Sequence, residues 1–309
     1  FPSYQFDFML SNPPYGKSWK VDAEKLGGKK GIIDSRFVTY FDDDPEFSMI
    51  PRVSDGQLLF LLNNVSKMKR TTELGSRIAE VHNGSSLFTG DAGSGESNAR
   101  RYLIENDLVE AIIALPENMF YNTGIGTYIW VLSNNKAEHR KGKIQLIDAT
   151  SLKSPLRKNL GNKNCELTPE IRRQIVDLYM TFEENEYSKI FNNNEFGYWK
   201  VTVLRPAYNE DGSIQRDKKG NPVADKELTD TEQIPFTYEG GIEAFFEKEV
   251  KPFAPDAWID EKQTKIGYEI SFTKYFYKPI QLRTLEEITA DIRSLEEETD
   301  GLLAEIIGG

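Results

Sequence analysis

The stretch YQFDFMLSNPPYGK, residues 4–17, joins an apolar segment to a polar, proline-rich exit. Residues 4–11 have the composition of a short buried strand, which we expect in the middle of a sheet, and Gly16-Lys17 is typical of a turn. Open α/β sheets bind their ligands just beyond the carboxyl ends of their strands. The stretch therefore predicts an α/β sheet with a functional site at residues 12–15.

The four residues Asn12, Pro13, Pro14 and Tyr15 suit the methylation of a planar amino group. An aniline-like nitrogen such as adenine N6 is a poor nucleophile because its lone pair is delocalised into the ring. The Asn12 carboxamide oxygen and the Pro13 carbonyl oxygen can each accept one of its N–H groups, which frees the lone pair to attack a methyl donor. These four residues are our candidate catalytic residues.

The neighbouring residue types support the same interpretation. The two prolines fix the backbone and lack the N–H groups that would compete for these carbonyls. Tyr15 offers a flat face on which a flipped-out base can stack. The alternative is a strand that leaves its sheet through an ordinary Asn-Pro turn.

Composition limits the class of protein. With 309 residues the chain is long enough for one large domain or two modest ones with a buried core. No apolar run approaches the ~18 residues that a membrane span needs, and the start lacks the pattern of a signal peptide. The single cysteine, Cys165, suits a reducing cytoplasm. His82 and His139 lie far apart without metal-ligand spacing, so we expect a cytoplasmic protein without a metal site.

The net charge of −11 argues against a broad DNA-binding surface on this chain alone. Residues 281–309 carry −6 of it, which leaves −5 for the other 280 residues. Two basic clusters, at residues 67–70 and 136–143, are either solvated charge or contacts for phosphates.

Helices and strands alternate in the first half of the chain. Helices are predicted at residues 57–68 and 94–106, and residues 17–50 are expected to form a long loop over a site. Strands are predicted at residues 75–81, 108–116, 127–132 and 143–148, the last at a sheet edge. Only a loop separates the strands at 108–116 and 127–132, so we expect an antiparallel hairpin there. Residues 1–150 therefore predict half of a doubly wound α/β sheet.

The sequence pattern of residues 151–280 differs from that of residues 1–150 and predicts an α+β extension. The expected elements are a helix from Thr168-Pro169 to about residue 182, a strand at 198–203, a protruding hairpin at 205–235 and a helix at 242–251.

Residues 281–309 are expected to form one long helix. Thr284 and Glu287 match a capping box at its start. Apolar side chains then recur at alternating spacings of three and four residues, interrupted by Thr299: Leu285, Ile288, Ile292, Leu295, Leu302 and Ile306. Such a narrow heptad stripe on an acidic helix favours packing against another chain. The alternative is a helix folded back on its own body.

Phe120 lies just past the strand at 108–116, at the sheet edge where we expect Tyr15. A base held between two aromatic faces needs such a residue, and each stacking contact contributes ~1–3 kcal/mol. The alternative is a loop aromatic that fills the core. A glycine-rich loop at residues 90–95, with Glu117 near the end of the next strand, lies too far from the preceding strand for a cofactor loop, so we assign no cofactor-binding residues.

Several motifs together resemble the modification (M) subunit of type I restriction–modification systems. They are NPPY at 12–15, NGSSLFTG at 83–90, GES at 95–97, RR at 100–101, LPENMFYNTGI at 115–125, QLIDA at 145–149, PDAWID at 255–260 and the segment 272–277. The resemblance covers nearly the whole chain, and residues 118–130 are its most specific part.

The resemblance implies an adenine-N6 DNA methyltransferase that uses S-adenosylmethionine on double-stranded DNA. A specificity (S) subunit would read the sequence and bind the carboxyl-terminal helix, and a restriction (R) subunit would cleave. Asn12, Pro13, Pro14 and Tyr15 would hold the target adenine, with Phe120 as the second stacking partner. The implied fold is the second half of a methyltransferase (Rossmann-like) sheet. The family's helical domain and glycine-rich cofactor strand would precede residue 1, so we expect this fragment to be inactive alone.

The residues by themselves leave other functions open. Asn-Pro-Pro-Tyr also serves methyltransferases that act on glutamine in proteins or guanine in RNA. A non-catalytic scaffold that binds the specificity subunit is a further alternative, and a DNA-binding adaptor is disfavoured by the charge.

Overall fold

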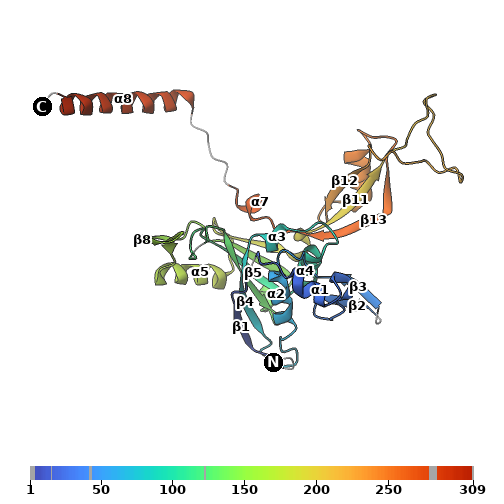
Figure 1. Cartoon of the computed structure of the whole chain (residues 1–309), viewed down its shortest axis with the longest axis horizontal. Helices are drawn as coiled ribbons and strands as arrows, with labels where there is room; N and C mark the ends of the chain where they lie inside the picture. Colours follow the sequence, from blue (N-terminus) through green and yellow to red (C-terminus); the bar gives the residue numbers. More distant parts are fainter. Residues whose placement is uncertain (1–3, 15, 42–43, 122, 278–283, 308–309) are drawn as a thin grey trace. The chain divides into compact units, whose positions relative to one another are not determined.

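The computed structural model describes residues 4–14, 16–41, 44–121, 123–277 and 284–307. The chain divides into two compact units, one that extends to Tyr275 and one that begins at Phe276 (Figure 1).

A six-stranded sheet forms the centre of the first unit (Figure 1). Its order is β1 (Phe8–Ser11), β4 (Arg77–Asn83), β6 (Thr127–Ser133), β5 (Val109–Leu115), β7 (Lys143–Asp148) and β10 (Ser188–Asn192). The pairs β1–β4 and β5–β7 are parallel, whereas β6 runs antiparallel to both of its neighbours and β10 runs antiparallel to β7. The predicted class, an α/β sheet with one antiparallel hairpin, is confirmed.

Helices cover both faces of this sheet. Cross-strand partners point to the same face, so Glu80, Trp130 and Ile112 share one face and Ala79, Val131 and Ala111 share the other. The first face packs against α2 (Gln57–Val65), whose Asn64 bonds to Glu80. The second packs against α5 (Pro169–Thr181) through Ile175. This arrangement explains why every residue of β5 is buried.

Two predictions about strand position are wrong. β7, expected at an edge, has neighbours on both sides because β10 pairs with it. β1, expected to be buried in mid-sheet, pairs only with β4 among the described strands. Phe8 and Leu10 of β1 are therefore 64% and 84% exposed.

Residues 17–50 are not the loop that we predicted. They contain α1 (Lys20–Lys25), a short 3-10 helix η1 (Lys29–Gly31) and a hairpin of β2 (Val38–Phe41) and β3 (Asp44–Ser48). The Trp19 indole N–H donates to the Arg52 carbonyl oxygen at 3.0 Å, which attaches this segment to the chain ahead of α2.

α3 (Ser85–Phe88) and α4 (Gly95–Glu105) follow β4. The N-cap of α4 is Ser94, the residue at which the helix was predicted to start. The buried Arg100 of α4 donates to the Tyr268 carbonyl oxygen at 2.6 Å. Burial lowers the pKa of Arg100 to about 10, so its guanidinium stays protonated at neutral pH. This contact joins α4 to the extension.

Residues 151–280, the predicted extension, contribute α5 and β10 to the six-stranded sheet and its helical cover, and the remainder is built mainly of strands. β8 (Ser154–Leu160) and β9 (Lys163–Glu166) form a hairpin, and β11 (Gly197–Leu204) lies between β12 (Asp230–Pro235) and β13 (Trp258–Tyr268) in a second sheet. Shorter elements are η2 (Glu138–Arg140), η3 (Asn193–Phe196), α6 (Gly241–Phe245), η4 (Phe246–Val250) and α7 (Phe272–Phe276).

The second unit contains α8 (Leu285–Ile307). The predicted capping box is present: the Thr284 N–H donates to Glu287 at 2.9 Å, and the Glu287 N–H donates to the Thr284 hydroxyl at 3.2 Å. Leu285, Ile292 and Leu295 are more than half exposed. Among the described helices, none is both long and apolar enough to cross a membrane.

Candidate functional site

The predicted site residues gather at the edge of the six-stranded sheet that is formed by the carboxyl ends of β1, β4 and β5. Ser11 pairs with Glu80, three residues before β4 ends at Asn83. Thr127, at the start of β6, pairs with both Asn83 and Leu115. Residues 12–14, the turn after Asn83 and the loop 116–126 therefore leave the sheet at the same edge.

Asn12 is exposed, and its carboxamide has no hydrogen-bond partner among the described residues. Pro13 is buried and Pro14 is exposed. Tyr15 lies outside the described residues. The carboxamide of Asn12 is thus open to solvent at the carboxyl end of β1, where it can bind an external amino group.

The residue before Asn12 is held by a buried polar network. The Ser11 hydroxyl donates to the Glu80 carboxylate at 2.5 Å, and the Asn64 amide donates to the same oxygen at 2.6 Å. The other oxygen of Glu80 lies 2.7 Å from His82 Nε2. The Glu80 and His82 side chains are fully buried. This network fixes β1 against β4 and α2 immediately ahead of Asn12.

The residue after Tyr15 is held by a second network. The Gly16 N–H donates to Asp55 Oδ1 at 3.1 Å. Asp55 is 6% exposed, and its Oδ2 accepts bonds from Gln57 Nε2 at 2.7 Å and from the Ser85 hydroxyl at 2.9 Å. Gln57 Nε2 also lies 2.7 Å from Asn83 Oδ1. The backbone is therefore held at Ser11 and at Gly16, a feature that the sequence alone did not indicate.

Phe120 reaches the same edge from the loop after β5. It is half-buried and packs against a core cluster that includes Ile113, Leu115 and Val131. Its neighbour Tyr121 is 66% exposed. The contact with the core fixes the position of Phe120, and its role as a stacking partner stays a prediction.

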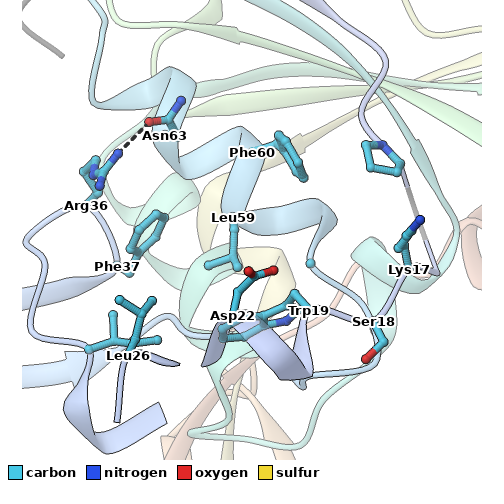
Figure 2. Close-up of a pocket in the computed structure, with 13 residues that line it drawn as sticks. Lys17, Ser18, Trp19, Asp22, Leu26, Arg36, Phe37, Leu59, Phe60 and Asn63 are labelled. Carbon is cyan, nitrogen blue, oxygen red and sulfur yellow. Dashed lines mark hydrogen bonds between the residues drawn. The ribbon is translucent and has the colours of Figure 1, made fainter. Parts of the chain in front are cut away.

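A cavity of about 490 Å³ opens beside Pro14, and sequence reasoning missed it (Figure 2). Its walls include Trp19 at the start of α1, Phe37 before β2 and Phe60 of α2. Phe60 is 46% exposed, whereas the other residues of α2 are buried or half-buried. The Arg36 guanidinium donates to Asn63 Oδ1 at 2.9 Å on the rim. The size is within the range of small-molecule sites.

The glycine-rich loop at residues 90–95 has structural neighbours. The Gly93 N–H donates to the Ile266 carbonyl oxygen of β13 at 3.1 Å, and Asp91 pairs with Lys200 of β11 at 2.7 Å. Lys200 holds the pKa of Asp91 below its ordinary value. In the described part of the chain, no three His, Cys, Asp or Glu side chains group as metal ligands would.

Comparisons with known proteins identify the family. The family model "N-6 DNA Methylase" matches residues 2–200. The type I restriction enzyme MjaIX methylase subunit of Methanocaldococcus jannaschii is 28% identical over 206 residues, 66% of this chain and 33% of that protein. The MjaVII methylase subunit of the same organism is 32% identical over 148 residues, 45% of this chain and 22% of that protein.

A solved methyltransferase subunit of a type I restriction–modification system from Streptococcus thermophilus has a TM-score of 0.49 and 24% identity. The match covers 63% of this chain and 36% of that one. Alignments with the curated relatives MjaIX and MjaVII span a third or less of their length. With well over half of its residues matched by the family model, the chain belongs to the N-6 DNA methylase family.

Proposed function

We propose that this chain carries the target-binding half of an adenine-N6 DNA methyltransferase and works as the modification subunit of a type I restriction–modification complex in the cytoplasm. The family match over residues 2–200 supports methylation. The observation that carries the proposal is the open carboxamide of Asn12 at the carboxyl end of β1, anchored on both sides.

In the proposed reaction, the target adenine leaves the duplex and stacks on Tyr15, with Phe120 as the second aromatic partner. The Asn12 carboxamide oxygen and the Pro13 carbonyl oxygen accept the two N6–H groups. This pulls N6 toward tetrahedral geometry, so that its lone pair points at the methyl carbon. The bound methyl donor would supply the methyl group, the new N6–C bond replacing the C–S bond of its sulfonium, and N6 would release one proton to water.

S-adenosylmethionine would supply the electrophilic methyl group when bound. The cavity beside Pro14 fits its adenosyl part, because Trp19, Phe37 and Phe60 provide flat apolar walls for a purine. The Asp22 carboxylate, which also lines the cavity, can accept hydrogen bonds from ribose hydroxyls.

The decisive test replaces Asn12 in the full-length protein assembled with its partner subunits. We expect Asn12→Ala to lower kcat for methyl incorporation into duplex DNA about 10²-fold or more, as loss of a transition-state contact does. Asn194→Ala is the matched control, because Asn194 is an exposed asparagine just after β10, which ends opposite Lys143 at the other edge of the sheet. Retained transfer in Asn12→Ala would refute the catalytic assignment. Transfer to protein or RNA in place of DNA would favour the alternative substrates.

The cofactor cavity has a separate test. Phe60→Ala removes one aromatic wall, and a lost stacking contact of ~1–3 kcal/mol raises the KM for S-adenosylmethionine about 5- to 150-fold. Phe60 is nearly half exposed, so we expect folding to be retained. An increase in the KM for DNA alone would place the target base in this cavity instead.

The exposed apolar side chains of α8 support a helical contact with the specificity subunit. Leu285, Ile288, Ile292 and Leu295 recur at the heptad spacing of a helix that packs on another helix. The restriction subunit would join the complex through surfaces that we do not assign.

A further inference from the structure

The β8–β9 hairpin carries a cluster of exposed basic side chains in this acidic protein. Residues 149–166 contain Lys153, Arg157, Lys158 and Lys163 and a single acidic residue, Glu166, whereas the whole chain has a net charge of −11. From Arg157 to Asn162 the hairpin is exposed on both of its faces, so its tip stands clear of the body.

The hairpin is fixed to the loop that carries Phe120. The Lys163 ammonium donates to the Met119 carbonyl oxygen at 2.7 Å, and the Asn164 N–H donates to the Asn118 carbonyl oxygen at 3.1 Å. β9 therefore lies directly against residues 117–119, at the sheet edge where Asn12 is exposed. A molecule that reaches Phe120 from solvent passes close to this hairpin.

The charges at the hairpin tip are not neutralised within the protein. Arg157 and Lys158 are exposed and form no ion pair with a described residue. The two basic clusters noted in the sequence differ, because several of their members have acidic partners: Lys69 with Asp7, Lys136 with Asp107, Arg140 with Glu110 and Lys141 with Glu138. The positive charges of Arg157 and Lys158 have no acidic partner among the described residues and lie beside the proposed base pocket, so they are suited to bind a polyanion.

We propose that the β8–β9 hairpin contacts the sugar–phosphate backbone of duplex DNA next to the flipped adenine, with Arg157 and Lys158 as phosphate ligands. This inference rests on the proposed function and adds the surface that positions the duplex. Phosphate contacts of this kind set register and affinity without reading sequence. They also allow an acidic chain to hold DNA locally while a partner supplies specificity.

The test measures DNA affinity of the full-length complex against salt concentration. Each phosphate contact contributes about −0.9 to the slope of log K against log salt, so R157Q with K158Q should reduce the slope by about 2. Affinity should fall to a similar extent for cognate and non-cognate duplexes, with kcat at saturating DNA unchanged. The charge-matched control is K218Q with K219Q, two exposed lysines in another surface hairpin.

A slope equal to that of the control would overturn the proposal, and so would loss of the specificity subunit from the complex, which would make the hairpin a protein contact. The charge-retaining pair R157K with K158R should bind DNA like wild type. If the glutamine pair folds poorly, the single variants R157Q and K158Q decide the matter, because each should reduce the slope by about 1. Methyl incorporation by the wild-type complex is measured first. Its absence would refute the proposed function, while the salt slopes would still report on the hairpin.

Discussion

Asp55 and Glu80 hold the backbone on either side of Asn12, and neither lies within the four-residue motif. Glu80 binds the Ser11 hydroxyl ahead of it, and Asp55 binds the Gly16 N–H behind it. A carboxylate that accepts several hydrogen bonds fixes a loop more firmly than a neutral acceptor does. We therefore infer that both are positioning residues for the carboxamide of Asn12.

Asp55→Asn tests this inference. Asparagine keeps the shape but places an N–H₂ group where Gln57 or Ser85 donates, so the Gly16 anchor loosens. We expect a loss of about 1–3 kcal/mol in unfolding free energy. We also expect kcat for methyl transfer to fall at least tenfold, with the KM for S-adenosylmethionine unchanged. Asp256→Asn, which disturbs the pair with Arg205 in the extension, is the control and should leave kcat unchanged. An unchanged kcat in Asp55→Asn would show that Asp55 has only a structural role.

At the scale of elements, local patterns were predictable and distant pairings were not. The β5–β6 hairpin, the helix start at Ser94 and the capping box at Thr284 follow from short runs of sequence, and all three are present. β10 was missed because Ser188–Asn192 has no clear alternation and is a strand only through pairing with β7. The networks around Asp55 and Glu80 join residues up to 69 positions apart, so no local pattern could reveal them.

The heptad-spaced apolar side chains of α8 can be tested by mutation at the level of a single element. Ile288→Asp with Ile292→Asp places two charges in the proposed helical interface, where unpaired charges are costly. We expect the Kd for the specificity subunit to rise at least about 100-fold, roughly 2.7 kcal/mol. Ala290→Asp with Ser294→Asp adds the same charge about half a helical turn away and should leave the Kd within about threefold. Equal weakening by both pairs would indicate a general charge effect, and no weakening by either would refute the interface.

At the scale of the whole molecule, the extension and the sheet form one unit, which extends to Tyr275. Arg100 connects them: it donates to the Tyr268 carbonyl oxygen of β13 and to those of Ser86 and Thr89, at 2.6, 3.0 and 2.9 Å. Ser86 directly follows Ser85, a member of the Asp55 network. The extension therefore supports the turn whose Ser85 belongs to the network that holds Gly16.

Arg100→Met would break this connection while keeping most of the side-chain volume. The buried hydrogen bonds to the Tyr268 and Ser86 carbonyl oxygens and the partly buried one to Thr89 would be lost, so we expect about 3–5 kcal/mol less unfolding free energy. Because one unit is affected, denaturant unfolding followed by Trp130 in the sheet and by Trp199 in the extension should shift together. Arg101→Met, which removes a partly exposed pair with Glu105 on the same helix, should cost about 1 kcal/mol or less. If Trp199 alone reported an earlier transition, the extension would be a separate folding unit and Arg100 only a local contact.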